Sequence, residues 1–143
     1  MAAPPLLRVV ANAHQFLTFT TPPALQEAVA YGLAKEDGYF DGMRARLAAS
    51  RDRLTAGLSE RGFRVLPSHG TYFLNVDLAP LGWTDDVAFC DALVRRHGVA
   101  AIPVSAFYPD AAVRHIVRLC FAKADPVLDA ALDRLASVAG ERA

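Results

Sequence analysis

The hydrophobic periodicity of the sequence changes at Gly62, and this change constrains the fold more than any other feature of the chain. Before Gly62, apolar residues recur every three or four positions, which is typical of amphipathic helices. After it, short segments such as His115–Phe121 show the alternation that predicts strands. The order of these patterns predicts an α+β fold, in which a helical leader precedes a small ββαββα C-terminal domain with its helices on one face of the sheet.

Capping and helix-breaking residues predict the boundaries of these elements. Three leader helices are expected to begin at Pro4, after an N-cap at Thr21, and at Tyr39. We therefore divide the chain into a helical segment, residues 1–61, and a small α+β domain, residues 62–143. The leader helices are too few and too one-sided to form a domain, so we expect them to pack against another surface. The elements expected in the second part are Phe63–Leu66, Thr71–Asp77, a helix capped within Thr84–Asp86, Val99–Pro103, His115–Phe121 and a last helix with its N-cap at Asp125.

Composition and charge exclude several classes of protein. The 143 residues are 53% hydrophobic and include 15 basic and 15 acidic side chains, and the mean hydropathy is +0.21. This apolar content excludes a disordered chain. Zero net charge argues against a nucleic-acid partner, because such binding depends on excess positive charge. Apolar surface combined with zero net charge favours association, so we expect a partner surface.

Residue spacing predicts the compartment and argues against metal and membrane sites. Cys90 and Cys120 are far apart and lie among apolar residues, which is typical of reduced, packed thiols in a cytosolic protein. The four histidines share no metal-ligand spacing, so no metal is expected. No segment approaches the ~20 apolar residues of a membrane-spanning helix, and the N-terminus lacks the pattern of a signal peptide. We expect a cytoplasmic protein that does not bind a membrane.

Arg118 is the strongest candidate for a functional residue. Strand alternation places it on one face with Ile116 and Cys120, and places Val117 and Leu119 on the other. A guanidinium among apolar neighbours is costly unless an anion meets it. Two interpretations stay open on these grounds: an internal salt bridge to an Asp or Glu, which residue statistics favour, and a substrate carboxylate held by the planar guanidinium.

Three further segments are candidate binding elements, each with a plainer structural explanation. Gly70–Phe73 suits close approach of the backbone to a ligand, although its aromatic residues are also typical of sheet packing. Pro103–Tyr108 is an aromatic loop at the end of a strand, where sites are often found. Phe16–Thr21 joins two helices and is also explained as a capped turn.

Six motifs in the same order resemble the C-terminal portion of class I/II aminotransferases, which are fold-type-I enzymes dependent on pyridoxal 5'-phosphate. The subgroup they resemble is that of the kynurenine, methionine and glutamine transaminases, whose members include cysteine-conjugate β-lyases. The resemblance covers essentially the whole chain, and each motif is weak alone. The motifs are Ala3-Pro4-Pro5-x-Leu7, His14-Gln15-Phe16 through Phe19, Thr21-Pro22-Pro23-x-x-Gln26, Gly70-Thr71-Tyr72-Phe73-Leu74, Ile102-Pro103-x-Ser105-x-Phe107-Tyr108 and Val117 to Lys123.

The resemblance implies roles for particular residues. Arg118 matches the arginine that binds the α-carboxylate of amino-acid and 2-oxo-acid substrates. Phe19 and Thr20 match a junction that reaches the neighbouring subunit's active site in the family's homodimers. Gly70, Tyr72 and Phe107 fall where the small domain closes over substrate. Residues 1–61 would then be the end of the large domain and the interdomain helix, and residues 62–143 the small domain.

The chain also departs from the family pattern. Its two lysines, Lys35 and Lys123, match neither the position nor the surroundings of the lysine that forms the Schiff base with the cofactor. Most residues that would bind the cofactor are missing too. We therefore assign no catalytic residue and expect this chain alone to be inactive. The alternative is a free-standing, non-catalytic α+β module that binds a ligand or dimerises.

Overall fold

The computed structural model describes residues 3–18, 20–110 and 112–138. The chain divides into two compact units, Met1–Asp41 and Gly42–Ala143, and each is considered by itself. No helix among the described residues combines the length and the apolar character needed to span a membrane.

The N-terminal unit is helical. Helices α1 (Pro4–Thr18) and α2 (Pro23–Leu33) have no buried residue, and α3 (Asp37–Glu60) begins here and continues into the second unit. The prediction of an N-cap at Thr21 is wrong, because Pro22 occupies that position and no side chain caps the helix. The adjacent prolines explain this, since a residue before proline avoids the helical region: Pro22 has a ψ of 139°, so the helix begins only at Pro23.

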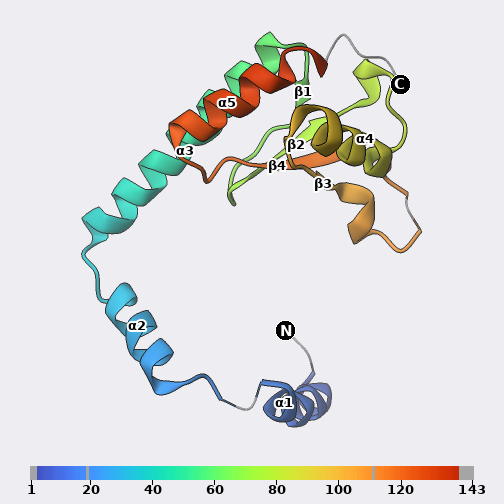
Figure 1. Ribbon diagram of the computed structural model, residues 1–143. Coiled ribbons are helices and arrows are strands. Elements are labelled where there is room, and N and C mark those ends of the chain that lie inside the picture. Colours follow the sequence, from blue (N-terminus) through green and yellow to red (C-terminus); the bar gives the residue numbers. More distant parts are fainter. Residues whose placement is uncertain (1–2, 19, 111, 139–143) are drawn as a thin grey trace. The chain divides into compact units, whose positions relative to one another are not determined.

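A four-stranded antiparallel sheet forms the centre of the C-terminal unit (Figure 1). Its order is β1-β2-β4-β3, and the longest ladder joins β2 to β4 with Asn75 opposite Arg118. The predicted α+β fold is confirmed, although all four strands are shorter than expected. The strands are β1 (Arg64–Val65), β2 (Phe73–Asp77), β3 (Ile102–Pro103) and β4 (Ile116–Cys120).

Helices cover one face of this sheet. Side chains of α3, α4 (Asp86–Ala92) and α5 (Asp125–Leu135) form one core with the inward residues of β2 and β4. The burial pattern of β4 alternates as predicted, so that Arg118 lies on the face away from the core. The fully buried core residues include Leu58, Leu74, Leu78, Leu93, Leu135, Val76 and Val117.

Short turns complete the unit. The 3-10 turns η1 (Ala79–Leu81) and η3 (Val104–Phe107) follow β2 and β3, and the π-helical turn η2 (Leu93–His97) extends α4. Asp85 caps α4 by accepting hydrogen bonds from the backbone N–H groups of Val87 and Ala88, as its sequence context predicts. Asp125, predicted to be an N-cap, instead lies in the first turn of α5, after Ala124 at the cap position.

Both cysteines are free thiols in the structure, as expected. Cys90 is buried in the core on α4, and this burial, with a smaller effect from Asp86, raises the pKa of its thiol to about 11. Cys120 is half-buried at the end of β4. A thiol with a raised pKa is a poor nucleophile, so Cys90 serves packing.

Candidate functional site

Arg118 lies in the middle of β4, between Asn75 of β2 and Ile102 of β3. Its guanidinium carbon is 4.8 Å from the centroid of the Phe107 ring and 5.2 Å from that of Phe73. Contacts of this kind stabilise a cation electrostatically, by about 0.5–2 kcal/mol. The rings therefore restrict the position of the guanidinium but do not neutralise its charge.

The internal salt bridge considered for Arg118 finds no partner. No carboxylate of the described residues forms an ion pair with this guanidinium. Asp77, on the neighbouring strand, is engaged elsewhere: its Oδ2 is 3.1 Å from Arg64 Nη1, and its Oδ1 accepts from the backbone N–H of Ala79. A half-buried guanidinium without a protein anion favours an external one, since the fork-shaped donor set matches a carboxylate.

A pocket of about 300 Å³ lies beside Arg118. The Oδ1 atom of Asn75 is buried there and has no hydrogen-bond partner among the described residues. An unsatisfied buried acceptor costs about 1–3 kcal/mol, so a ligand that donates to it would gain binding energy. The pocket is lined by Pro67, Ser68, His69, Gly70, Thr71, Phe73, Asn75 and Arg118.

The loop before β2 is held by its own hydroxyl groups. Ser68 Oγ lies within hydrogen-bond distance of the carbonyl oxygens of Gly70 (3.0 Å) and Phe73 (3.1 Å), which share its one hydrogen, and Thr71 Oγ1 accepts from the backbone N–H of Phe73. Thr71 has a φ of +64°, the left-handed region that a β-branched residue rarely adopts. Such a conformation costs about 1–3 kcal/mol, and residues held this way cluster at functional sites.

The predicted site residues fall into two groups. Gly70 and Phe107 lie near Arg118, Gly70 in the pocket lining and Phe107 through its ring contact. Tyr72 does not line this pocket; it is half-exposed, and its ring is 4.4 Å from that of Phe73. Thr20 belongs to the N-terminal unit, where its hydroxyl donates to the carbonyl of Thr21, and Phe19 lies outside the described residues.

Three residues of the site were not assigned a role from the sequence. Phe73 contacts Arg118 directly, Asn75 faces it across the ladder, and Thr71, within the segment predicted as a binding element, has a left-handed backbone. A signal exists for Asn75: it is a polar residue between Leu74 and Val76, where alternation turns it away from the core. A β-carbon added at Gly70 would meet no atom within 4 Å.

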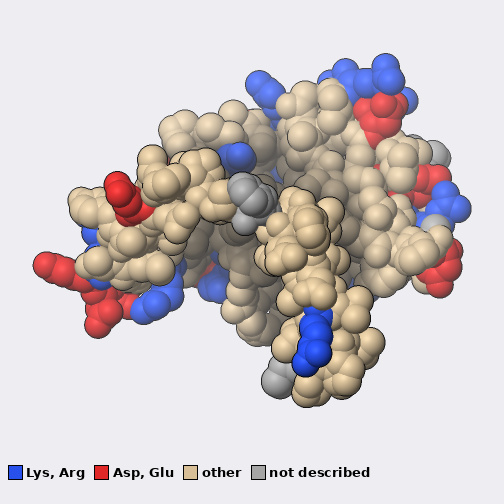
Figure 2. Space-filling view, turned by 90° about the horizontal axis from the view of Figure 1, so that it is seen from below, with Lys and Arg blue, Asp and Glu red and all other residues tan. Residues whose placement is uncertain are grey.

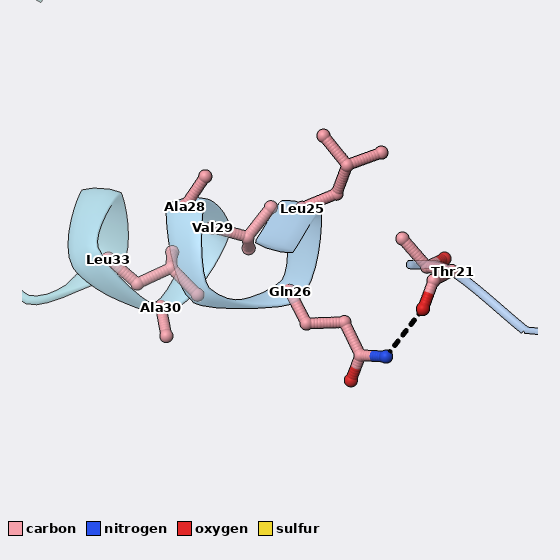
Figure 3. Close-up of a pocket in the computed structure, with 7 residues that line it drawn as sticks. All are labelled: Thr21, Leu25, Gln26, Ala28, Val29, Ala30 and Leu33. Carbon is pink, nitrogen blue, oxygen red and sulfur yellow. Dashed lines mark hydrogen bonds between the residues drawn. The ribbon is translucent and has the colours of Figure 1, made fainter. Parts of the chain in front are cut away.

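A second hollow lies on α2 in the N-terminal unit (Figure 3). Figure 3 shows the amide of Gln26 donating to the carbonyl of Thr21, over a distance of 2.7 Å. The other lining residues are apolar and come from this one helix: Leu25, Ala28, Val29, Ala30 and Leu33. A hollow with one wall and no charged group is typical of a surface that meets another protein surface.

The described residues contain no cluster of three or more His, Cys, Asp or Glu suited to a metal ion. The face shown in Figure 2 is mostly uncharged, and its acidic and basic side chains lie in small, scattered groups. Neither observation adds a second charged site to the one around Arg118.

Comparisons with known proteins point to one family. The family model for aminotransferase class I and II matches residues 2–135. The probable N-succinyldiaminopimelate aminotransferase DapC of Mycobacterium tuberculosis is 46% identical over 96% of this chain, and the methionine aminotransferase of Escherichia coli is 39% identical over 94%. The mouse kynurenine–oxoglutarate transaminase 1 is 29% identical over 95%.

A solved structure shows the same fold. The M. tuberculosis N-succinyldiaminopimelate aminotransferase structure superposes with a TM-score of 0.84 at 47% identity, over 93% of this chain and 35% of that one. The three sequence relatives match over 36%, 35% and 37% of their own length. The chain thus spans about a third of the length of the proteins it matches.

Proposed function

The chain belongs to the aminotransferase class I and II family, and from that premise we propose that it is the C-terminal part of an enzyme that transfers an amino group between an amino acid and a 2-oxo acid. In this proposal Arg118 binds the α-carboxylate that both substrates share. The observation that carries it is a mid-sheet guanidinium that contacts two aromatic rings and forms no ion pair with a described residue.

The arrangement suits a carboxylate for reasons of geometry and charge. A guanidinium donates two parallel hydrogen bonds to a carboxylate, which fixes the orientation of the substrate as well as its position. The rings of Phe73 and Phe107 replace part of the water around the half-buried guanidinium, and an ion pair is stronger where less water surrounds it. Because donor and acceptor substrates carry the same carboxylate, one arginine serves both halves of the reaction.

The described residues do not fit the cofactor, pyridoxal 5'-phosphate. Lys35 is half-buried and its Nζ donates to the hydroxyl of Tyr31 at 2.7 Å, and Lys123 is exposed after β4. Neither lysine lines the pocket beside Arg118. We therefore derive no cofactor step from this chain and expect residues 1–143 alone not to transaminate. The cofactor would be bound by other parts of the whole enzyme.

The finer assignments follow the same family. We propose residues 1–61 as the end of the large domain and the interdomain helix, and residues 62–143 as the small domain. A homodimer is proposed, with Phe19 and Thr20 reaching the neighbouring site and Gly70, Tyr72 and Phe107 closing over substrate. The free thiols of Cys90 and Cys120 support a cytoplasmic location.

For the substrate side chain we propose the kynurenine, methionine or glutamine type, with cysteine-conjugate β-lyase side activity. Two of the relatives are named as methionine and kynurenine aminotransferases, which supports this choice. The aromatic rings around Arg118 favour an apolar or sulfur-containing side chain. Initial rates with methionine, kynurenine, glutamine and N-succinyldiaminopimelate would rank these substrates directly.

The test of carboxylate binding is Arg118→Ala in the protein encoded by the complete reading frame. We expect kcat/KM for amino-acid substrates to fall. The corresponding loss of transition-state stabilisation should be ~2–5 kcal/mol, the usual cost of removing one member of a desolvated charge pair. Arg95→Ala is the matched control, because Arg95 is exposed and pairs with Asp91 on α4. Unchanged kcat/KM in Arg118→Ala would contradict the assignment.

The DNA upstream of Met1 separates this proposal from a free-standing binding or dimerisation module. An in-frame region that encodes a lysine-containing cofactor domain supports the aminotransferase. A promoter and a ribosome-binding site directly before Met1 would instead support the module. Either result is obtained by sequencing alone.

A further inference from the structure

Asp86, the first residue of α4, is fully buried, with 0% of its surface exposed. Its Oδ2 accepts a hydrogen bond from the backbone N–H of Ser105 at 2.8 Å, and its Oδ1 accepts one from Ser105 Oγ at 2.6 Å. A buried carboxylate is costly unless hydrogen bonds satisfy it. Both oxygens of Asp86 are engaged with a single residue, which lies 19 positions further along the chain.

The same turn of α4 also holds the end of the loop that Ser105 begins. The backbone N–H of Asp86 donates to the carbonyl of Arg114 at 2.8 Å. Asp85 Oδ2 accepts from Arg114 Nη2 at 2.7 Å. The start and the end of the segment 105–114 are therefore attached to two consecutive residues of one helix, and neither attachment uses Arg118.

Ser105 connects this attachment to the carboxylate site. It lies in the turn η3, whose last residue is Phe107, and its carbonyl accepts from the backbone N–H of Tyr108 at 3.0 Å. The ring of Phe107 stands 4.8 Å from the guanidinium carbon of Arg118. Asp86 is thus linked by hydrogen bonds to Ser105, and the backbone of η3 joins Ser105 to Phe107, whose ring contacts Arg118.

We propose that Asp86 is a positioning residue for the carboxylate site: by holding Ser105, it fixes the turn that keeps Phe107 against Arg118. This inference rests on the proposed role of Arg118. Phe107 is 56% exposed, so packing alone does not hold its ring, and the hydrogen bonds of Ser105 supply the missing restraint. A guanidinium already held in its binding orientation loses less conformational entropy when substrate arrives.

The test uses Ser105→Ala and Ser105→Thr in the enzyme encoded by the complete reading frame. Ser105→Ala removes the hydroxyl donor, so we expect the KM for an amino-acid substrate to rise about tenfold, with kcat within about twofold of wild type. Ser105→Thr keeps a hydroxyl and should restore KM. For the corresponding amine without a carboxylate, Ser105→Ala should leave KM unchanged.

A double-mutant cycle shows whether Ser105 acts through Phe107. If it does, Phe107→Leu alone raises KM, and adding Ser105→Ala raises it no further, because the two variants remove the same restraint. Additive effects, or an equal effect on the amine, would overturn the proposal. Asp86→Asn keeps the size of the side chain and removes its charge, so it should also raise KM. If Ser105→Ala does not fold, Asp86→Asn serves in its place as the test of the positioning role.

Failure of this inference is distinguishable from failure of the proposed function. If Arg118→Ala and Phe107→Leu raise KM while Ser105→Ala and Asp86→Asn do not, the carboxylate site stands and the positioning role is wrong. If Arg118→Ala has no effect, the proposed function itself is wrong, and the positioning role falls with it. Melting temperatures of all variants, measured together, exclude global unfolding as the cause of a higher KM.

Discussion

Arg118 carries a charge that its own described surroundings leave without a counter-ion. Two aromatic rings contact the guanidinium, and the residue opposite it on β2 is an amide, Asn75, whose buried Oδ1 has no partner among the described residues. Both features cost folding free energy in the absence of ligand. Sites that bind substrate often hold such a cost in the free protein.

A direct prediction at this residue pair is the effect of Asn75→Asp. Directly opposite residues of an antiparallel ladder have neighbouring Cβ atoms, so the new carboxylate would pair with Arg118. We expect the free energy of unfolding to rise by roughly 0.2–1 kcal/mol, as for other cross-strand charge pairs. Urea denaturation of the two proteins measures this difference.

The same variant should weaken binding of carboxylate substrates, because the internal carboxylate competes for the guanidinium. Asn75→Leu is the matched control: it removes the unsatisfied amide and adds no charge. A variant that is more stable and binds substrate as well as wild type would show that Arg118 does not hold the substrate carboxylate.

Sequence patterns predicted the orientation of Arg118 and not its surroundings. Alternation along β4 alone places Arg118 away from Val117 and Leu119, and the burial pattern confirms this. The contact with Phe73 depends on the register between β2 and β4, and the contact with Phe107 depends on how η3 is held by Asp86. Both contacts depend on pairing between residues far apart in the sequence, which local periodicity does not predict.

Helix packing explains the glycine in the middle of α3. A β-carbon built on Gly57 would lie 2.5 Å from Cδ1 and 2.8 Å from Cδ2 of Leu132, a buried residue of α5. Gly57 therefore lets α3 and α5 approach closely (Figure 1). The helical pattern of the sequence alone gives no reason for this residue, because glycine weakens a helix interior.

We predict that Gly57→Ala destabilises the C-terminal unit by about 1–3 kcal/mol, since overpacking outweighs the gain in helix propensity. Gly42→Ala in the same helix is the control: its new methyl meets only Arg46 Nη1, at 3.6 Å, so it should stabilise by about 0.5–1 kcal/mol. Chemical denaturation measures both. If Gly57→Ala stabilised the protein as much as Gly42→Ala, close packing against Leu132 would be wrong.

An ion pair joins the same two helices and predicts a pH dependence. Arg53 Nε and Nη2 donate to Asp129 Oδ1 and Oδ2, both at 2.7 Å, and this pairing lowers the pKa of Asp129 below its ordinary value. A carboxyl whose pKa is lower in the folded state adds stability above its unfolded pKa of about 3.9 and loses that contribution as pH falls through the folded value.

Asp129→Asn should therefore lower the melting temperature near neutral pH and make little difference in acid. The difference from wild type is expected to shrink as the pH falls below about 4 and to weaken in high salt, because the pair is exposed. Thermal melts from pH 2 to pH 7 test this. A difference that is constant over that range would mean that the pair contributes no pH-dependent stability.

At the scale of the whole molecule, the two units differ in how well they bury their apolar residues. The core residues all lie between Leu47 and Val138, within the C-terminal unit. Helices α1 and α2 bury no residue, and large apolar side chains such as Phe16 and Leu17 are 82% and 85% exposed. The high apolar content of the sequence thus includes apolar side chains that α1 and α2 leave exposed, the kind of surface that the sequence predicted would meet a partner.

This division predicts different behaviour for the two parts. Residues 42–143 should unfold in one cooperative transition, because they contain the complete core. The 143-residue chain should self-associate with rising concentration, because α1 and α2 expose many large apolar side chains. Sedimentation velocity of both proteins at matched concentrations, alongside denaturation curves, measures association and cooperativity together.

The double variant Phe16→Glu/Leu17→Glu is the control that keeps the chain length and should reduce association. If residues 42–143 associated as strongly as the whole chain, the surface that recruits a partner would lie on the C-terminal unit and not on α1 and α2.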